Sequence, residues 1–128
     1  MKRRTKQFAL NVLGIVDQLP QCVAARVLAN QVARSSTSVA ANYRAACKGR
    51  SKPEFISKLG VAEEEADETQ FWLEMISEKR LAPEDKVQPL IREAWELAAI
   101  LAASRLSASG RREPIANRQS AIGNRQSP

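Results

Sequence analysis

The chain has no histidine, only two cysteines and six aromatic side chains among its 128 residues. Cys22 and Cys47 lie far apart and form no CxxC pair, so we expect neither a zinc site nor a disulfide framework. A di-iron carboxylate site needs Glu-x-x-His motifs, which the lack of histidine excludes. Neither thiol has a base to activate it. The sequence therefore predicts no enzyme: no catalytic residue, no metal and no cofactor.

A long apolar run is also missing. No stretch of about 18 apolar residues occurs, so no membrane span is expected. The first twenty residues mix basic and apolar side chains, as a signal peptide does, but Asn11 and Asp17 interrupt the apolar run. Phe8, Val12 and Ile15 recur there at helical spacing. We therefore predict an amphipathic first helix and a cytoplasmic protein.

With few aromatics among 44% hydrophobic residues, the core must consist of Leu, Ile, Val and many Ala, which favours close-packed helices. The length suits one domain. Apolar periodicity predicts an all-α fold with helices over about residues 5–18, 21–48, 52–79 and 83–106. Beyond Ser107 the periodicity ends and the tetrapeptide NRQS occurs twice. We therefore predict a helical domain over residues 1–107 and a disordered basic tail over residues 108–128.

The second and third predicted helices meet at a tight corner. Gly49 follows a helical run, where a left-handed residue often ends a helix. Ser51 and Glu54 form a capping-box pattern, in which the Ser hydroxyl accepts a hydrogen bond from the Glu54 amide. Pro53 is tolerated in a first helical turn. These signals end one helix near Lys48 and start the next near Lys52.

Two segments interrupt the expected helices. Residues 35–38, SSTS, are poor helix formers, so the second helix either bends there or lets a neighbour approach closely. Pro89 removes the amide bond to Asp85, which predicts a kink or a restart of the fourth helix near Gln88.

Charge is unevenly distributed. The net charge of +6 comes from the two ends of the chain, and residues 7–107 carry about −1. Within that part, acids form one block on the third helix, from Glu63 to Glu68. The second helix and the corner carry a basic stripe opposite the apolar face: Arg26, Arg34, Arg44, Lys48, Arg50 and Lys52.

Three segments resemble a small bacterial family related to the protein encoded in intervening sequences of large-subunit ribosomal RNA genes. They are RSSTSVAANYR (34–44), RSKPEFISK (50–58) and EEADETQFW (64–72). The resemblance implies an antiparallel up-and-down four-helix bundle that assembles as a homo-oligomer, a ring-like pentamer. It also implies links to accessory proteins of retroelements, and thus to nucleic acid and a reverse transcriptase. The resemblance brings no catalytic residues.

The basic stripe has two interpretations. It can hold phosphates of RNA or DNA by charge neutralisation, without base stacking because aromatics are absent from that face. Alternatively, it pairs with the acidic block, within the chain or between subunits. Two functions follow: a nucleic-acid-binding accessory protein, or a homo-oligomeric scaffold whose partner is another protein.

Overall fold

The structure, a computed structural model, describes residues 1–110. It contains four helices, α1 (Lys2–Val16), α2 (Val23–Cys47), α3 (Lys52–Glu78) and α4 (Glu84–Ala108), with no strand in this range. The all-α fold is therefore confirmed, with every helix boundary within three residues of its expected position. The predicted tail lies outside the described residues from position 111 onward, so the division at residue 107 stays a prediction.

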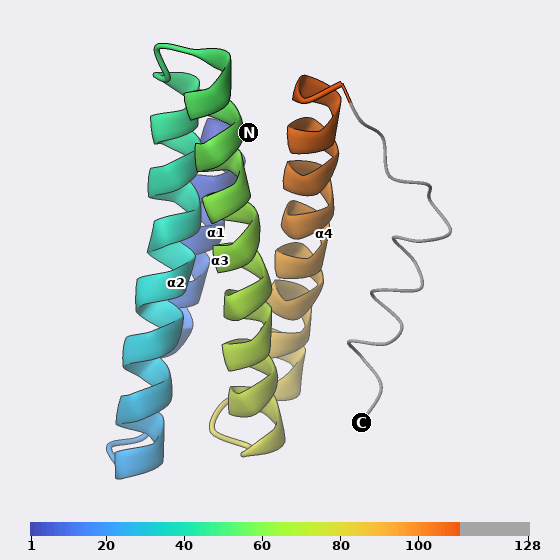
Figure 1. The fold of residues 1–128 in the computed structure, drawn as a ribbon. Coiled ribbons are helices and arrows are strands. Elements are labelled where there is room, and N and C mark those ends of the chain that lie inside the picture. Colours follow the sequence, from blue (N-terminus) through green and yellow to red (C-terminus); the bar gives the residue numbers. More distant parts are fainter. Residues whose placement is uncertain (111–128) are drawn as a thin grey trace.

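The helices run alternately up and down in chain order (Figure 1). α2 packs against α1 and α3, α3 packs against α4, and a smaller contact between α1 and α4 completes the bundle. The amino terminus and the α2–α3 corner lie at one end of the bundle, and the other two connections lie at the opposite end (Figure 1). This topology places the start of α1 beside the end of α2.

The α2–α3 corner is capped as its sequence predicts. The backbone amide of Glu54 donates to Ser51 Oγ at 3.2 Å, and α3 starts at Lys52. The prediction of a left-handed conformation at Gly49 is wrong, because Gly49 does not have a positive φ. The residue serves close packing instead: a Cβ at Gly49 would lie 3.1 Å from the Ala46 carbonyl oxygen and 3.3 Å from the Phe55 amide nitrogen.

The left-handed residue appears instead at the end of α3. Arg80 has φ 58°, and the Leu81 amide donates to the Ile76 carbonyl at 3.0 Å while the Arg80 amide donates to that of Ser77. These two bonds form a Schellman motif, in which glycine is the usual left-handed residue. Arginine therefore occupies a strained backbone position at the α3–α4 turn.

The expected restart near Gln88 is also wrong, since α4 continues from Glu84 to Ala108 with Pro89 inside it. Pro89 is the sixth residue of the helix, so its pyrrolidine ring disturbs the backbone hydrogen bonds only in the first turns of α4. Val87 and Leu90, on either side of it, are buried in the core. Packing against the other helices therefore holds the segment helical despite the missing amide.

The core consists of two apolar clusters separated by polar residues. One cluster, toward the α3–α4 turn, contains large side chains such as Phe8, Leu73 and Leu97. The other, toward the α2–α3 corner, is rich in alanine and includes Ala62, Ala66 and Leu101. Between them lie four buried polar residues: Ser35, Ser36, Thr69 and Gln70. The SSTS segment therefore sits inside an unbroken α2, with two of its serines buried against neighbouring helices.

Within residues 1–110, no helix combines the length and apolar character that crossing a bilayer requires. The same part of the chain contains no group of three or more Cys, Asp or Glu side chains suited to hold a metal ion.

Candidate nucleic-acid interface

The basic stripe predicted from the sequence does not form one surface. From Arg26 to Lys48 the stripe extends about 33 Å along α2, at 1.5 Å per residue. Arg26 lies near the α1–α2 connection, beside Leu19 and Cys22. Arg44, Lys48, Arg50 and Lys52 lie at the opposite end of the bundle, on the last turns of α2 and at the corner. The structure therefore brings four of the six predicted residues to one end.

Arg34, between these ends, forms ion pairs within the chain. Its guanidinium donates to Glu65 at 3.2 Å and to Glu68, both on α3. Of the two interpretations of the stripe, pairing with the acidic block therefore describes Arg34. The remaining stripe residues form no ion pair with another residue of the described part.

A hollow of about 900 Å³ lies between α1 and α2, and we call it the basic groove. Five cationic side chains line it, three from the start of α1 and two from the end of α2: Lys2, Arg3, Lys6, Arg44 and Lys48. Its uncharged lining comprises Gln7, Leu10, Ala40 and Ala41. All five cations are exposed. The methyl side chains of Ala40 and Ala41 are small and leave room for a ligand between the cations of α1 and those of α2.

No acid lines the basic groove. None of its five cations forms an ion pair within residues 1–110. The first turn of α1 contains no acid either, so Lys2 and Arg3 lie at the positive end of the helix dipole. That placement disfavours the folded chain by a few tenths of a kcal/mol per cation. Cations held against the dipole and left unpaired make the groove strongly attractive to anions.

The groove's chemistry suits phosphates and not bases. Lysine and arginine neutralise phosphates at any sequence, whereas single-stranded bases need aromatic side chains to stack on. The lining contains no aromatic residue. Arg50 and Lys52 lie at the same end of the bundle, at the corner above α2 and α3. They extend the positive surface beyond the groove.

The six predicted site residues all lie on α2 and at the corner, so the predicted stripe did not include the cations of α1 that line the groove. The signal was present as two pairs of cations spaced four residues apart, Lys2 with Lys6 and Arg44 with Lys48. Residues spaced by four lie on one side of a helix. In an antiparallel hairpin the first turn of one helix lies beside the last turn of the next, which joins the two pairs.

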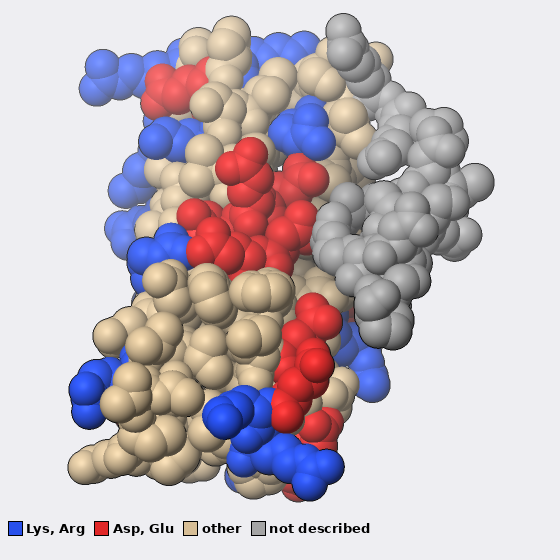
Figure 2. All heavy atoms as spheres, turned by 60° about the horizontal axis from the view of Figure 1, so that its bottom comes forward, with Lys and Arg blue, Asp and Glu red and all other residues tan. Residues whose placement is uncertain are grey.

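The acids of α3 gather on another face, where they form a block in the middle of the view in Figure 2. Ion pairs between neighbouring helices neutralise some of the acids of α3 and α4. They join α2 to α3, α3 to α4 and α1 to α4. Arg105 of α4 donates to Glu63 of α3 at 2.8 Å. Arg4 of α1 donates two hydrogen bonds, of 2.8 and 2.7 Å, to the carboxylate of Glu93 on α4. The Arg4 hydrogen bonds lower the pKa of Glu93, against the opposing effect of burial.

Beside the acidic block lies an uncharged surface (Figure 2). Four large apolar side chains are exposed on the first turns of α2 and in the second half of α3, and we call them the apolar patch: Val23 (71% exposed), Val27, Phe71 (51% exposed) and Met75. Residues seven apart share a helix face. Val27 lies seven positions before Arg34, and Met75 lies seven positions after Glu68. Because Arg34 and Glu68 form an ion pair between α2 and α3, Val27 and Met75 lie on the same side of these two helices, about two turns nearer the α3–α4 turn.

Known proteins resemble the chain over most of the bundle. The family model of the 23S rRNA-intervening sequence protein matches residues 1–103. A crystal structure of a protein of unknown function, from the S23 ribosomal protein family of Bacteroides thetaiotaomicron, superposes with a TM-score of 0.73 at 29% sequence identity. The match covers 78% of this chain and 93% of that one. No curated protein matches. The chain belongs to the 23S rRNA-intervening sequence protein family.

Proposed function

We propose that this chain is a non-catalytic, homo-oligomeric accessory protein that holds the backbone of RNA or DNA in the basic groove. One observation supports the proposal most: five unpaired cations from two helices line one groove that contains no acid. Such a surface binds phosphates without reading sequence. Arg50 and Lys52 provide further phosphate contacts, whereas Arg26 and Arg34 do not contribute directly.

Salt-dependent binding to a labelled duplex tests this function. A variant with Lys6, Arg44 and Lys48 changed to Gln removes three groove cations. A matched control changes Arg26, Lys79 and Lys86 to Gln, which removes the same charge elsewhere on the exposed surface. Each lost phosphate contact lowers the slope of log K against log salt by about 0.9. We expect the groove variant to lose roughly two to three from that slope, and the control to change little.

Equal losses in both variants would mean that net charge alone drives binding, and would overturn the assignment to the groove. Binding by the wild type that does not weaken with salt would contradict phosphate recognition altogether. Changing Arg50 and Lys52 to Ala should weaken duplex binding to a smaller extent, because these residues lie outside the groove.

The apolar patch favours the homo-oligomer. Four large apolar side chains exposed along one seam are typical of a protein interface. The family resemblance suggests a ring-like pentamer, which repeats each basic groove around the ring and multiplies weak phosphate contacts. Arg34 pairs with α3 in its own chain, so the α2–α3 ion pairs do not need a second subunit.

Sedimentation measures the assembly. Changing Val27 and Met75 to Ser should reduce the sedimenting mass, since both side chains leave the apolar patch. Leu10→Ser is the matched control, because Leu10 is 52% exposed but lies in the basic groove. A wild type that sediments as a monomer would refute the oligomer.

The second candidate function is a homo-oligomeric scaffold for another protein, such as the reverse transcriptase suggested by the family resemblance. The same apolar patch favours it. Assembly that persists while duplex binding is absent at low salt would select this function over the first.

A further inference from the structure

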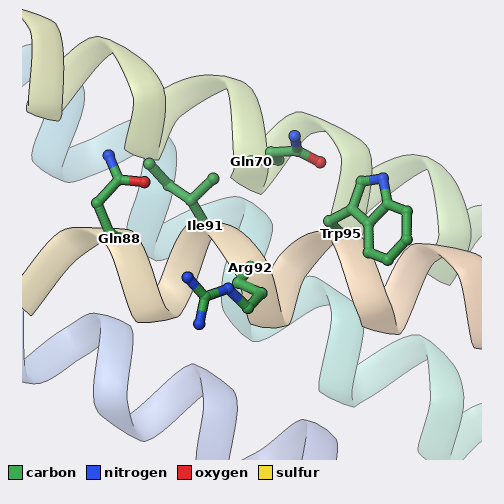
Figure 3. A pocket seen from close by; sticks show the side chains of 5 residues that line it. All are labelled: Gln70, Gln88, Ile91, Arg92 and Trp95. Carbon is green, nitrogen blue, oxygen red and sulfur yellow. The ribbon is translucent and has the colours of Figure 1, made fainter. Parts of the chain in front are cut away.

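The seam between α3 and α4 contains two adjoining hollows, separate from the basic groove and the apolar patch. Their volumes are about 320 and 270 Å³, and Gln70, Gln88 and Ile91 line both. Trp95 and Arg92 border the first, and Glu74 and Glu78 border the second. Figure 3 shows the first hollow, with Gln70 on α3 and the other four side chains on α4. The seam lies on a different face from the basic groove.

Two buried polar atoms in this seam have no hydrogen-bond partner, Gln70 Oε1 and Trp95 Nε1. Gln70 is only 2% exposed, although it lines both hollows. Its amide oxygen is turned toward the Trp95 indole (Figure 3). Unpaired buried polar groups are rare because each one destabilises the fold. A leucine at position 70 would avoid this penalty, so the amide suggests a purpose in binding.

The neighbouring groups provide further acceptors. Glu84 accepts hydrogen bonds from Ser77 Oγ and, at 2.8 Å, from Gln88 Nε2. These bonds fix the Gln88 side chain and use its nitrogen, which leaves the Gln88 oxygen for another donor. The carboxylates of Glu74 and Glu78 border the same space. The two hollows together therefore present amide oxygens and two carboxylates beside one indole ring, with Arg92 as a cation at the border of the first hollow.

We propose that this seam binds an arginine side chain in a peptide segment of a partner protein. A guanidinium is planar, carries five N–H donors and stacks on aromatic faces. Rotation about the last torsion of Gln70 turns its oxygen into the hollow, where a guanidinium N–H can reach it. The Trp95 ring offers a stacking surface, and Glu74 and Glu78 attract the positive charge. The peptide carbonyl beside the arginine accepts a hydrogen bond from Trp95 Nε1.

Charge selects a protein over a nucleic acid here. Two carboxylates, Glu74 and Glu78, outnumber the one cation, Arg92, among the charged side chains that line the two hollows, so the phosphates that accompany a nucleobase meet net repulsion. Free arginine carries its own carboxylate and meets the same repulsion. A lysine ammonium lacks the flat face and the fixed set of donors.

Nuclear magnetic resonance of the full chain tests the site through the indole N–H signal of Trp95, assigned by comparison with Trp72→Phe. The probe is N-acetyl-arginine methylamide, which has a guanidinium between two peptide groups. A ligand of this size binds with a Kd of about 1 mM. We expect the Trp95 signal to shift and saturate. The neutral citrulline analogue should bind at least about tenfold more weakly, with the lysine analogue and free arginine also weaker.

Gln70→Leu should abolish the shift while raising Tm, a combination that a misfolded variant cannot produce. Glu78→Gln, at an exposed position, should weaken binding severalfold, and Gln7→Leu on α1 should leave it unchanged. A Trp95 signal that does not respond, or that responds equally to the citrulline analogue, would overturn the proposal. Wild-type affinity in Gln70→Leu would do so as well.

Discussion

The hydroxyl groups of Ser35 on α2 and Thr69 on α3 are joined by a hydrogen bond of 2.8 Å between the two apolar clusters of the core. Thr69 Oγ1 also lies 2.7 Å from the Glu65 carbonyl oxygen. Thr69→Val should therefore destabilise the fold by about 1 kcal/mol, because the buried Ser35 hydroxyl keeps only its longer contact of 3.4 Å with the Val32 carbonyl oxygen. Adding Ser35→Ala should cost little more, since both polar groups are then gone. Urea unfolding of the two single variants and the double variant measures the coupling, and strictly additive losses would contradict it.

Arg80→Gly should stabilise the chain by about 1 kcal/mol. Arg80 adopts φ 58°, a conformation that strains any residue with a Cβ but not glycine. Lys79→Gly is the control, because Lys79 has φ −78° and gains nothing from glycine. Thermal unfolding should show a higher Tm for the first variant and a lower one for the second. The opposite order would mean that the Arg80 side chain makes a stabilising contact larger than the strain.

The Arg4–Glu93 ion pair should make stability depend on pH. The pKa of Glu93 is lowered in the folded chain, chiefly by the Arg4 hydrogen bonds. Its stabilisation is therefore present above the unfolded pKa of about 4.3 and is lost as pH falls through the lower folded value. Arg4→Gln should be less stable than wild type at pH 6, by on the order of 0.5 kcal/mol for a partly exposed pair. The difference should shrink as the pH falls below about 4.3.

The matched control is Arg3→Gln, which removes a neighbouring cation that forms no ion pair within the described part of the chain. Its effect on stability should not change between pH 6 and pH 3. If both variants show the same pH dependence, the effect comes from the charge of the helix end and not from the pair.

Gln70→Leu should raise the free energy of unfolding by about 1 kcal/mol, because an unpaired buried amide is replaced by an apolar group of similar size. Urea unfolding checks this, with the exposed Gln7→Leu as a control expected near zero. A destabilised Gln70→Leu would indicate that the amide is satisfied in the folded chain, and would remove the reason to assign it a ligand.

Local signals predicted the helices well. Ser51, Pro53 and Glu54 act within one turn of each other, so the start of α3 follows from neighbouring residues alone. Arg80 escaped prediction because its left-handed conformation results from how α3 and α4 must turn, and the local sequence offers no glycine there. Pro89 predicted a kink or a restart of α4 near Gln88, and the restart is wrong because the buried residues on either side hold the segment helical.

The candidate site depended on contacts between distant parts of the chain. Arg34 and Arg44 share a face of α2, yet only Arg34 lies opposite acids of α3, and helical periodicity does not distinguish the two. The groove needs Lys6 of α1 beside Arg44 of α2, which depends on how the first two helices cross. Sequence pattern places charges on a helix face, whereas packing decides which of them find partners.

The start of α1 has a practical consequence for fusion proteins. Met1 caps the helix, with its carbonyl accepting from the Thr5 amide at 2.9 Å, and Lys2 and Arg3 line the basic groove directly after it. A purification tag joined at Met1 therefore sits at the mouth of the groove. An acidic tag would occupy the proposed phosphate positions and mimic a loss of binding, and a histidine-rich tag would add cations below about pH 6.5. Removing the tag leaves the five groove cations as the charge that an anion meets.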